Sequence, residues 1–310
     1  MGRGDLTDAE WERLRPFLPV SNRRCGRWRD HQQVIDGIPH RVRTGVHWRD
    51  LPERFGPWKT VYERHRLWSA DGTWARLLQQ VQAEADAVGD IDWDVSVDST
   101  VVRAHQHAAG ARTDRPPGPG LKGGRGRGTP GRDAVAEPRR PPGGGGAGGE
   151  GLCRSRGGFT TKVRLSAGGR CRPLSLVLTP GQRADCTQFE RVLEKIRVPR
   201  TGPGRPRTTP DSLAADKAYS YGPCREYLRR RGIPHAIPQK TDSRAARLRK
   251  GSHGGRPPGF NEERYRKRNT IERAINKLKH ARAVATRYDK RGYVYLGTVT
   301  AAALLIWLRT

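Results

Sequence analysis

Apolar residues recur at helical spacing through the first third of the chain. Thr7 and Glu10 match a capping box ahead of the first apolar run, which Pro19 ends. Three later runs have the same spacing and are bounded by Asp, Gly or Pro residues that commonly start or stop helices. The expected helices cover about 7–18, 30–45, 57–71 and 73–85. The pattern predicts a small all-helical domain over residues 1–88.

Pro39 conflicts with the pattern around it. It falls inside the second expected helix, where a proline removes a backbone hydrogen bond and costs about 3 kcal/mol. A kink in the helix is the usual consequence. Nothing else in the sequence accounts for a proline at this position.

The periodicity changes from helical to alternating at Ile91. In the segment IDWDVSVDST, apolar residues fall on one face of a strand and polar ones on the other, with the acid Asp98 near the strand's end. A second acid, Asp216, directly follows another short apolar segment. Further strands are expected at 159–167, 172–181, 212–215 and 235–238, and helices at 186–196 and 223–231. This order of elements predicts an α/β domain with a mixed sheet over 89–310.

A segment rich in glycine and proline interrupts the predicted sheet. Residues 111–158 contain 16 Gly, 7 Pro and ten Lys and Arg, with few apolar side chains. Such a composition buries too little apolar surface to offset the entropy lost on ordering. The segment is therefore expected to be a disordered insert.

The segment from Tyr265 to Lys279 predicts one amphipathic helix. Helical spacing places Tyr265, Arg268, Glu272 and Lys279 on one narrow face, beside an apolar stripe of Ile271, Ile275 and Leu278. The carboxylate of Glu272 is therefore expected at the rim of a core. A surface helix with an ion-paired face gives the same pattern.

Among the bulk properties, the net charge is the most informative about a binding partner. The 310 residues include 60 Lys and Arg against 31 Asp and Glu, a formal charge of +29. Such an excess suits a polyanionic partner such as nucleic acid, although a GC-rich coding sequence would also enrich Arg, Gly, Pro and Ala. In the helical region, the basic residues that can face DNA are Arg41, Arg43, Arg49, Arg54, Lys59, Arg64 and Arg66.

Other candidate sites and signals are weak. The five cysteines form no C-x2-C pair, so neither zinc nor a disulfide framework is expected. His105 and His107 would share one strand face without a third ligand, which favours a surface or substrate contact. The N-terminal segment has no apolar region of a secretory signal. The uncharged run 292–308 is short for a membrane span and is expected to be a buried helix.

The spacing Tyr265-x2-Arg268-x3-Glu272-x6-Lys279 resembles a motif of bacterial DDE transposases, in particular the insertion sequence 5 family. The segments DST at Asp98, LTPGQ, ADKAY at Asp216 and RTGVHWRDLP also look like that family. The resemblance implies a ribonuclease-H-like catalytic domain behind a helix-turn-helix-like N-terminal domain that binds the ends of the element.

The resemblance also implies a mechanism and its residues. Asp98, Asp216 and Glu272 would be catalytic and would bind two Mg²⁺ ions, for which Mn²⁺ can substitute. Carboxylates brought together repel unless cations neutralise them, and their hard oxygens suit these ions. The residues expected to contact DNA are Tyr265, Arg268, Lys279, Lys217, Arg43 and Arg49.

A bacterial transposase of this kind would act on double-stranded DNA in the cytoplasm, associated with the nucleoid. Its substrates would be the terminal inverted repeats and a target, and pairing of two ends would require a homodimer or a larger assembly. Two alternatives remain at this stage. The chain can be a catalytically silent DNA-binding regulator or decaying copy of such an element, which Pro39 and the insert favour. It can also be a ribonuclease-H-like nuclease unrelated to transposition.

Overall fold

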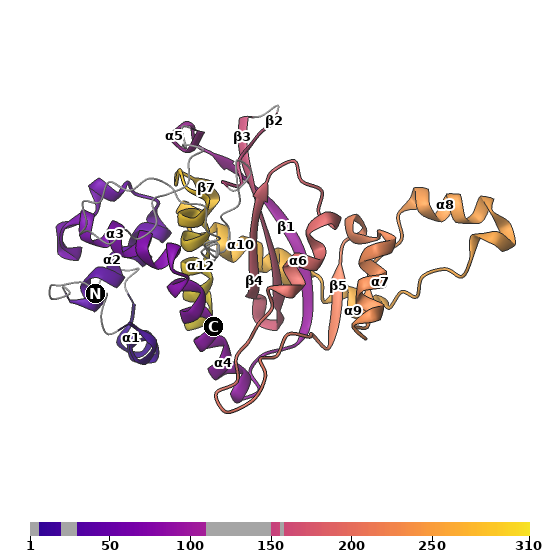
Figure 1. Ribbon diagram of the computed structural model, residues 1–310, viewed down its shortest axis with the longest axis horizontal. Helices are drawn as coiled ribbons and strands as arrows, with labels where there is room; N and C mark the ends of the chain where they lie inside the picture. Colours follow the sequence, from indigo (N-terminus) through magenta and orange to yellow (C-terminus); the bar gives the residue numbers. More distant parts are fainter. Residues whose placement is uncertain (1–5, 20–29, 110–149, 156–157) are drawn as a thin grey trace, which may run out of the picture.

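A helical N-terminal region and one mixed sheet share a single core in the computed structural model (Figure 1). The structure describes residues 6–19, 30–109, 150–155 and 158–310. Most of the predicted insert, residues 111–149 and 156–157, therefore lies outside the described residues. The chain is a mixed α/β protein, as its sequence pattern predicts.

In residues 6–19 and 30–88, which the structure describes, the N-terminal region contains four α-helices, as the apolar spacing predicts. Thr7 and Glu10 make the expected capping box, in which the Thr7 hydroxyl accepts from the Glu10 N–H at 3.2 Å and the Glu10 carboxylate from the Thr7 N–H at 2.7 Å. Gly45 ends the second helix in the left-handed region, with φ of 73°. The elements are α1 (Asp8–Leu14), η1 (Arg15–Phe17), α2 (His31–Thr44), η2 (Trp48–Asp50), η3 (Glu53–Phe55), α3 (Trp58–Ala70) and α4 (Thr73–Ala87).

Helix α2 continues without a break through Pro39. The proline is buried, and its ring borders a small apolar pocket between the N-terminal helices and the C-terminal helix. Leu6, Leu14, Ile35 and Trp74 line the same pocket. Apolar contact of the ring therefore offsets part of the lost hydrogen bond, and this gives a physical reason for the proline that the sequence pattern lacks.

The sheet combines antiparallel and parallel pairs. Strand β1 pairs antiparallel with β3, which pairs antiparallel with β2 and β4. On its other edge β1 runs parallel to β5 and β7, and β5 runs parallel to β6. The strands are β1 (Asp94–Ala104), β2 (Cys153–Ser155), β3 (Gly158–Gly168), β4 (Arg172–Pro180), β5 (Ser212–Ala215), β6 (His235–Ala236) and β7 (Thr286–Arg287). The predicted mixture of strand directions is confirmed.

The structure corrects three boundaries that the sequence suggests. Strand β1 begins at Asp94 rather than Ile91 and continues to Ala104. The predicted insert extends too far, because Cys153–Ser155 form β2 and pair with β3. The segment 265–279 is two helices rather than one, α9 (Glu262–Arg266) and α10 (Asn269–Lys279), separated by a turn at Lys267 and Arg268.

Most of the remaining helices lie against the sheet or the N-terminal helices, whereas α8 extends away from the body of the protein (Figure 1). Helix α12 lies on one side of the sheet and α6 on the other (Figure 1). Short 3-10 turns cap several strands and helices. These elements are α5 (Gln106–Ala109), η4 (Gly169–Cys171), η5 (Cys186–Gln188), α6 (Phe189–Glu194), η6 (Lys217–Tyr219), α7 (Gly222–Arg230), α8 (Thr241–Arg249), η7 (Gly251–Gly254), α11 (Arg282–Ala285) and α12 (Gly292–Arg309).

Helix α12 lies between the N-terminal helices and the sheet (Figure 1). It is long and apolar enough to cross a membrane, but 78% of it is buried inside the protein, as expected for a core helix. Its Trp307 indole donates to the Pro173 carbonyl of β4 at 2.6 Å. On the opposite side, Thr298 lies 3.1 Å from the buried His65 ring of α3. The predicted buried helix at 292–308 is therefore confirmed.

Candidate active site

The register between β1 and β5 brings the first two acids together. These strands run parallel, and Val97 pairs with Ala215 in the last aligned position. Asp98 is the next residue along β1, and Asp216 directly follows β5. Because neighbouring residues in a parallel register point to the same face, the two carboxylates lie side by side at this edge of the pair.

Asp98 occupies a partly dehydrated position. Its side chain is 25% exposed, and one carboxylate oxygen accepts the Ser99 N–H at 2.8 Å. Burial raises the pKa of Asp98 above its ordinary value, and the nearby carboxylate of Asp216 adds to this effect. Asp216 caps the following turn and accepts the N–H of Lys217 at 2.6 Å.

Glu272 lies on the exposed side of α10. The buried side of this helix, Ile271, Ala274 and Leu278, packs toward β1 and β3. The Glu272 side chain is 48% exposed, so it lies farther out in solvent than the expected position at the rim of a core. The carboxylate is held by an ion pair rather than by burial.

Arg268 links the first and third acids. One of its terminal nitrogens lies 2.6 Å from the Glu272 carboxylate, and the other lies 3.5 Å from Asp98. The guanidinium also lies over the Tyr265 ring, 5.7 Å from its centroid. Asp98, Glu272, Arg268 and Tyr265 are therefore joined in one network across β1, α9 and α10, although the two helices are not continuous.

The other candidate DNA contacts lie outside this network. Lys217 is exposed beside Asp216, and Lys279 is half-buried in the last turn of α10. Arg43 and Arg49 are exposed on the N-terminal region, where Arg49 lies over the Trp58 ring. The structure therefore brings together the acids, Arg268 and Tyr265, and leaves Lys217, Lys279, Arg43 and Arg49 outside the network.

Comparison with known proteins decides the family. Residues 91–307 match the family described as "Transposase DDE domain", and residues 6–78 match the family "Putative transposase of IS4/5 family". The chain belongs to the DDE transposases. The family indicated by the Tyr265 to Lys279 spacing is thereby confirmed.

Three relatives of this transposase come from bacteria. A Sinorhizobium fredii protein, "Uncharacterized protein y4sN", is 40% identical over 34% of this chain and 82% of the relative. The "Insertion element IS402 uncharacterized 16.2 kDa protein" of Burkholderia cepacia is 33% identical over 34% and 76%. The "Putative transposase for insertion sequence element IS6501" of Brucella ovis is 27% identical over 48% and 99%. No solved structure matches the chain significantly.

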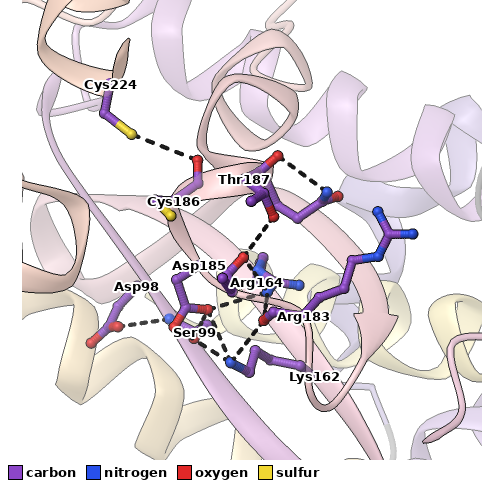
Figure 2. Close-up of polar contacts among 11 residues, drawn as sticks. Asp98, Ser99, Lys162, Arg164, Arg183, Asp185, Cys186, Thr187 and Cys224 are labelled. Atoms are coloured by element: carbon purple, nitrogen blue, oxygen red, sulfur yellow. Dashed lines mark hydrogen bonds and ion pairs between the residues drawn. The ribbon is translucent and has the colours of Figure 1, made fainter. Parts of the chain in front are cut away.

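A polar cluster behind Asp98 was missed by the sequence analysis (Figure 2). Ser99 points to the opposite side of β1 from Asp98, and its hydroxyl donates to Asp185 at 2.8 Å. Lys162 and Arg164 of β3 approach the same carboxylate at 3.2 and 3.3 Å. The cluster of Ser99, Lys162, Arg164 and Asp185 therefore supports the backbone that carries the first acid of the transposase.

The sequence held only a faint signal for this cluster. Asp185 follows the segment LTPGQ, which resembles the family, but nothing in that segment marks it as a partner of Ser99. The two residues are 86 positions apart, and β3 supplies the cations between them. Only the paired register of β1 and β3 brings the group together.

Two predicted DNA contacts of the helical region are wrong. Arg41 is buried and forms an ion pair with the equally buried Asp289 at 3.3 Å. Arg64 is also buried, and desolvation lowers its pKa to about 10. Both are structural groups of the core and cannot reach a phosphate.

His105 and His107 are not on a strand, contrary to expectation. His105 follows β1 and stacks on Tyr288, with ring centroids 4.8 Å apart, and His107 lies in α5. Across the described parts of the chain, no group of three His, Cys, Asp or Glu side chains is arranged to hold a metal ion. Within the described residues, His105 and His107 therefore make aromatic ring contacts and belong to no such group.

The donor chemistry of the acid site suits a hard cation. Asp98, Asp216 and Glu272 offer carboxylate oxygens, which Mg²⁺ and Mn²⁺ prefer, and DDE transposases as a family depend on divalent metals. Arg268 already supplies a positive charge between Asp98 and Glu272. The residues therefore fit such ions in type, and Arg268 lies between Glu272 and Asp98.

Proposed function

We propose that this transposase binds the ends of an insertion sequence, cleaves phosphodiester bonds there and transfers the freed 3′-hydroxyls to target DNA. The observation that carries the proposal is the register of β1 and β5, which sets Asp98 beside Asp216, with Glu272 joined to Asp98 through Arg268. A ribonuclease-H-like fold is part of this proposal. The antiparallel β1, β3 and β4 followed by the parallel β5 and β6 support it.

Asp98, Asp216 and Glu272 would hold two Mg²⁺ ions, or Mn²⁺ in their place. When bound, such ions activate a water or a 3′-hydroxyl and stabilise the leaving oxygen in an attack on phosphorus. The contribution of the chain is to hold the carboxylates ionised and oriented. Burial raises the pKa of Asp98 and so disfavours its charged form, and a cation held beside the carboxylate would offset that cost.

The cations around the acids would position DNA. Arg268 can exchange its carboxylate partners for a phosphate, because its guanidinium has donors for both. Lys217 and Lys279 would neutralise neighbouring phosphates, and the ring of Tyr265 would pack against a flanking nucleotide. Arg43 and Arg49 would contact duplex from the helix-turn-helix-like N-terminal domain at residues 1–88.

Two ends must be held at once for transposition, so the active form is proposed to be a homodimer or a larger assembly on double-stranded DNA. Its place of action would be the bacterial cytoplasm, at the nucleoid. The catalytic domain would span residues 89–310, interrupted by the segment 111–149 that lies outside the described residues.

The test is cleavage of a DNA fragment that carries the inverted repeats flanking the coding region, with Mg²⁺ or Mn²⁺ and with EDTA as the control. Glu272→Gln keeps the size of the side chain but removes its charge. We expect it to lower cleavage by at least about a hundredfold and to change the Kd for the repeats less than about threefold. Loss of binding to the repeats instead of loss of cleavage would contradict the catalytic assignment of Glu272.

The alternative is a silent DNA-binding regulator or decaying copy. Tight binding to the repeats without metal-dependent cleavage would support it. The continuous helix around Pro39 removes one of the two features that favoured this alternative, because α2 is not damaged there. Preference for an RNA–DNA hybrid over duplex with defined ends would instead indicate an unrelated nuclease.

A further inference from the structure

A basic arm extends from the end of the molecule that lies farthest from the N-terminal helices (Figure 1). We define it as residues 239–260, which include α8 and η7. It has a single acid, Asp242, and six cations: Lys240, Arg244, Arg247, Arg249, Lys250 and Arg256. None of these residues was assigned a role by the motifs around the acids.

The arm is not held by a core. Helix α8 and the turn η7 contain no buried residue, and Leu248 of α8 is 60% exposed. Helix α8 has nine residues and no side-chain cap, and it packs mainly against η7. A helix of this length is marginal in water without packing partners. The body of the protein therefore contributes little packing to the arm.

The charges of the arm are available to a partner. Within the described chain, none of its six cations forms an ion pair, whereas Arg266 of the neighbouring α9 pairs with Glu262 at 3.1 Å. Like charges along a short helix repel one another and are stabilised by a polyanion. A protein interface would require aromatic or apolar anchors, but the arm offers only Leu248 and Phe260, and the Phe260 ring already packs on Tyr265.

The base of the arm adjoins the candidate active site. The arm leaves the sheet after β6, which pairs with β5, the strand that leads into Asp216. It returns at α9, which contacts both β5 and β6 and precedes Arg268. A duplex held at the acids therefore lies next to the base of the arm.

We propose that the basic arm is a second DNA-binding surface, which lies along the phosphates of duplex bound at the acids. This inference rests on the proposed function for the presence of DNA at that site. Its occupant is duplex DNA contacted through phosphates, because the cations form no ion pair within the described chain and the aromatic ring of the arm, Phe260, already packs on Tyr265. A second copy of the chain would bring another arm of the same charge.

The test removes four exposed charges, with Lys240, Arg244, Arg249 and Lys250 each changed to Gln. Each phosphate contact contributes roughly 0.9 to the slope of log K against log salt, so the slope is expected to fall by about 2 to 4. Affinity for a duplex near physiological salt is expected to fall about 10- to 100-fold. The measurement is the Kd of the full chain for labelled duplex at several salt concentrations.

The matched control removes four exposed cations from the surface around α6 and the connector after it, with Arg191, Arg197, Arg200 and Arg205 each changed to Gln. We expect a smaller loss of affinity and a smaller change in slope in this variant. Both variants should keep the thermal unfolding temperature of the wild type, since neither set is buried. Equal losses in the two variants would overturn the arm as a distinct surface.

The outcome separates this inference from the proposed function. If the arm variant binds duplex with the wild-type Kd and slope while Asp98→Asn abolishes cleavage, the arm inference fails and the transposase proposal stands. If no metal-dependent cleavage occurs but the arm variant still loses affinity and slope, the arm inference stands. A change in oligomeric state on a sizing column with an unchanged salt slope would overturn it in favour of a protein contact.

Discussion

At the scale of single residues, the candidate site depends on which acid of β1 remains available to bind a cation. Asp94 and Asp98 lie on the same polar side of β1, but Asp94 is already bound by Ser212 at 2.5 Å and by Lys267. These partners lower the pKa of Asp94, with the Lys267 contact as the larger cause, whereas burial raises that of Asp98. Asp94 is therefore occupied by protein partners, whereas Asp98 is more available to a cation, although the alternation along the strand does not distinguish the two acids.

Asp185 is expected to act as a positioning residue through Ser99. Asp185→Asn keeps an oxygen for the Ser99 hydroxyl but removes the charge that faces Lys162 and Arg164. Loss of such an outer contact typically lowers metal affinity or activity about 10- to 100-fold. We expect the Mn²⁺ concentration for half-maximal cleavage to rise within that range while the Kd for DNA stays unchanged.

The control for this prediction is Asp211→Asn, which removes an exposed carboxylate paired only with Arg207. It should leave the Mn²⁺ dependence as in the wild type. A normal Mn²⁺ dependence in Asp185→Asn would show that the cluster has a purely structural role.

The sequence identifies residues at this scale only where their spacing is local. Arg268 and Glu272 are four positions apart, so helical geometry alone predicts their contact, and the 2.6 Å ion pair agrees. Asp185 and Ser99 meet through strands far apart in the chain, and no local pattern encodes that meeting.

At the scale of elements, packing between helices explains what local propensity does not. Pro39 and the junction of α3 with α12 both show this. Pro39, unfavourable in its own helix, borders an apolar pocket shared with the C-terminal helix, and the buried His65 of α3 contacts Thr298 of α12. Arg268 lies at the turn that separates α9 from α10 and reaches Asp98 from there.

Pro39→Ala is expected to stabilise the protein by about 1 to 2 kcal/mol. The substitution restores the backbone donor, which is worth about 3 kcal/mol in a helix interior, and loses about 1 kcal/mol of apolar burial. Urea unfolding would measure the difference. Pro52→Ala, at the start of η3 and outside any helix interior, should not be stabilising. A loss of stability in Pro39→Ala would show that ring packing exceeds the backbone term.

His65 is expected to make the α3–α12 junction sensitive to acid. Burial lowers its pKa to about 4, far below the ordinary value of 6.5. The folded protein therefore binds fewer protons than the unfolded chain between these values, and stability falls as pH decreases through that window. The loss sums to about 3 kcal/mol, at 1.36 kcal/mol for each pH unit between the two pKa values.

Urea unfolding at pH 7, 6, 5 and 4 tests this dependence. His65→Gln removes the titrating ring while keeping a polar side chain near Thr298. Its stability should change less with pH between 6.5 and 4 than that of the wild type, even if it is lower at pH 7. Parallel curves for the two proteins would exclude His65 as the acid-sensitive group.

At the scale of the whole molecule, α12 joins the two regions that the sequence divides at residue 88. It contacts α2, α3 and α4 on one side and β4 on the other. The alternation and the helical periods predict the elements of each region, and the apolar run predicts that this helix is buried. They do not predict what it packs against, because an almost uniformly apolar helix carries no directional pattern.

We expect the N-terminal helices and the sheet to unfold together. Six of the eight tryptophans lie in the first 88 residues, so fluorescence reports mainly on the helical region. Circular dichroism follows the helices and strands of the whole chain. The two signals should give one urea midpoint within error, since a shared core favours a single cooperative transition. Separate midpoints would show that α12 does not couple the regions.

The place of α12 in the chain has a consequence for biosynthesis. The helices α1 to α4 are complete by Ala87, but the surface that covers them begins at Gly292. At roughly 5 to 20 residues per second, a ribosome needs about 10 to 40 seconds to make the intervening chain. During that time the faces of α2, α3 and α4 that pack against α12 lack this native partner, so the nascent chain exposes apolar surface until its last helix is made.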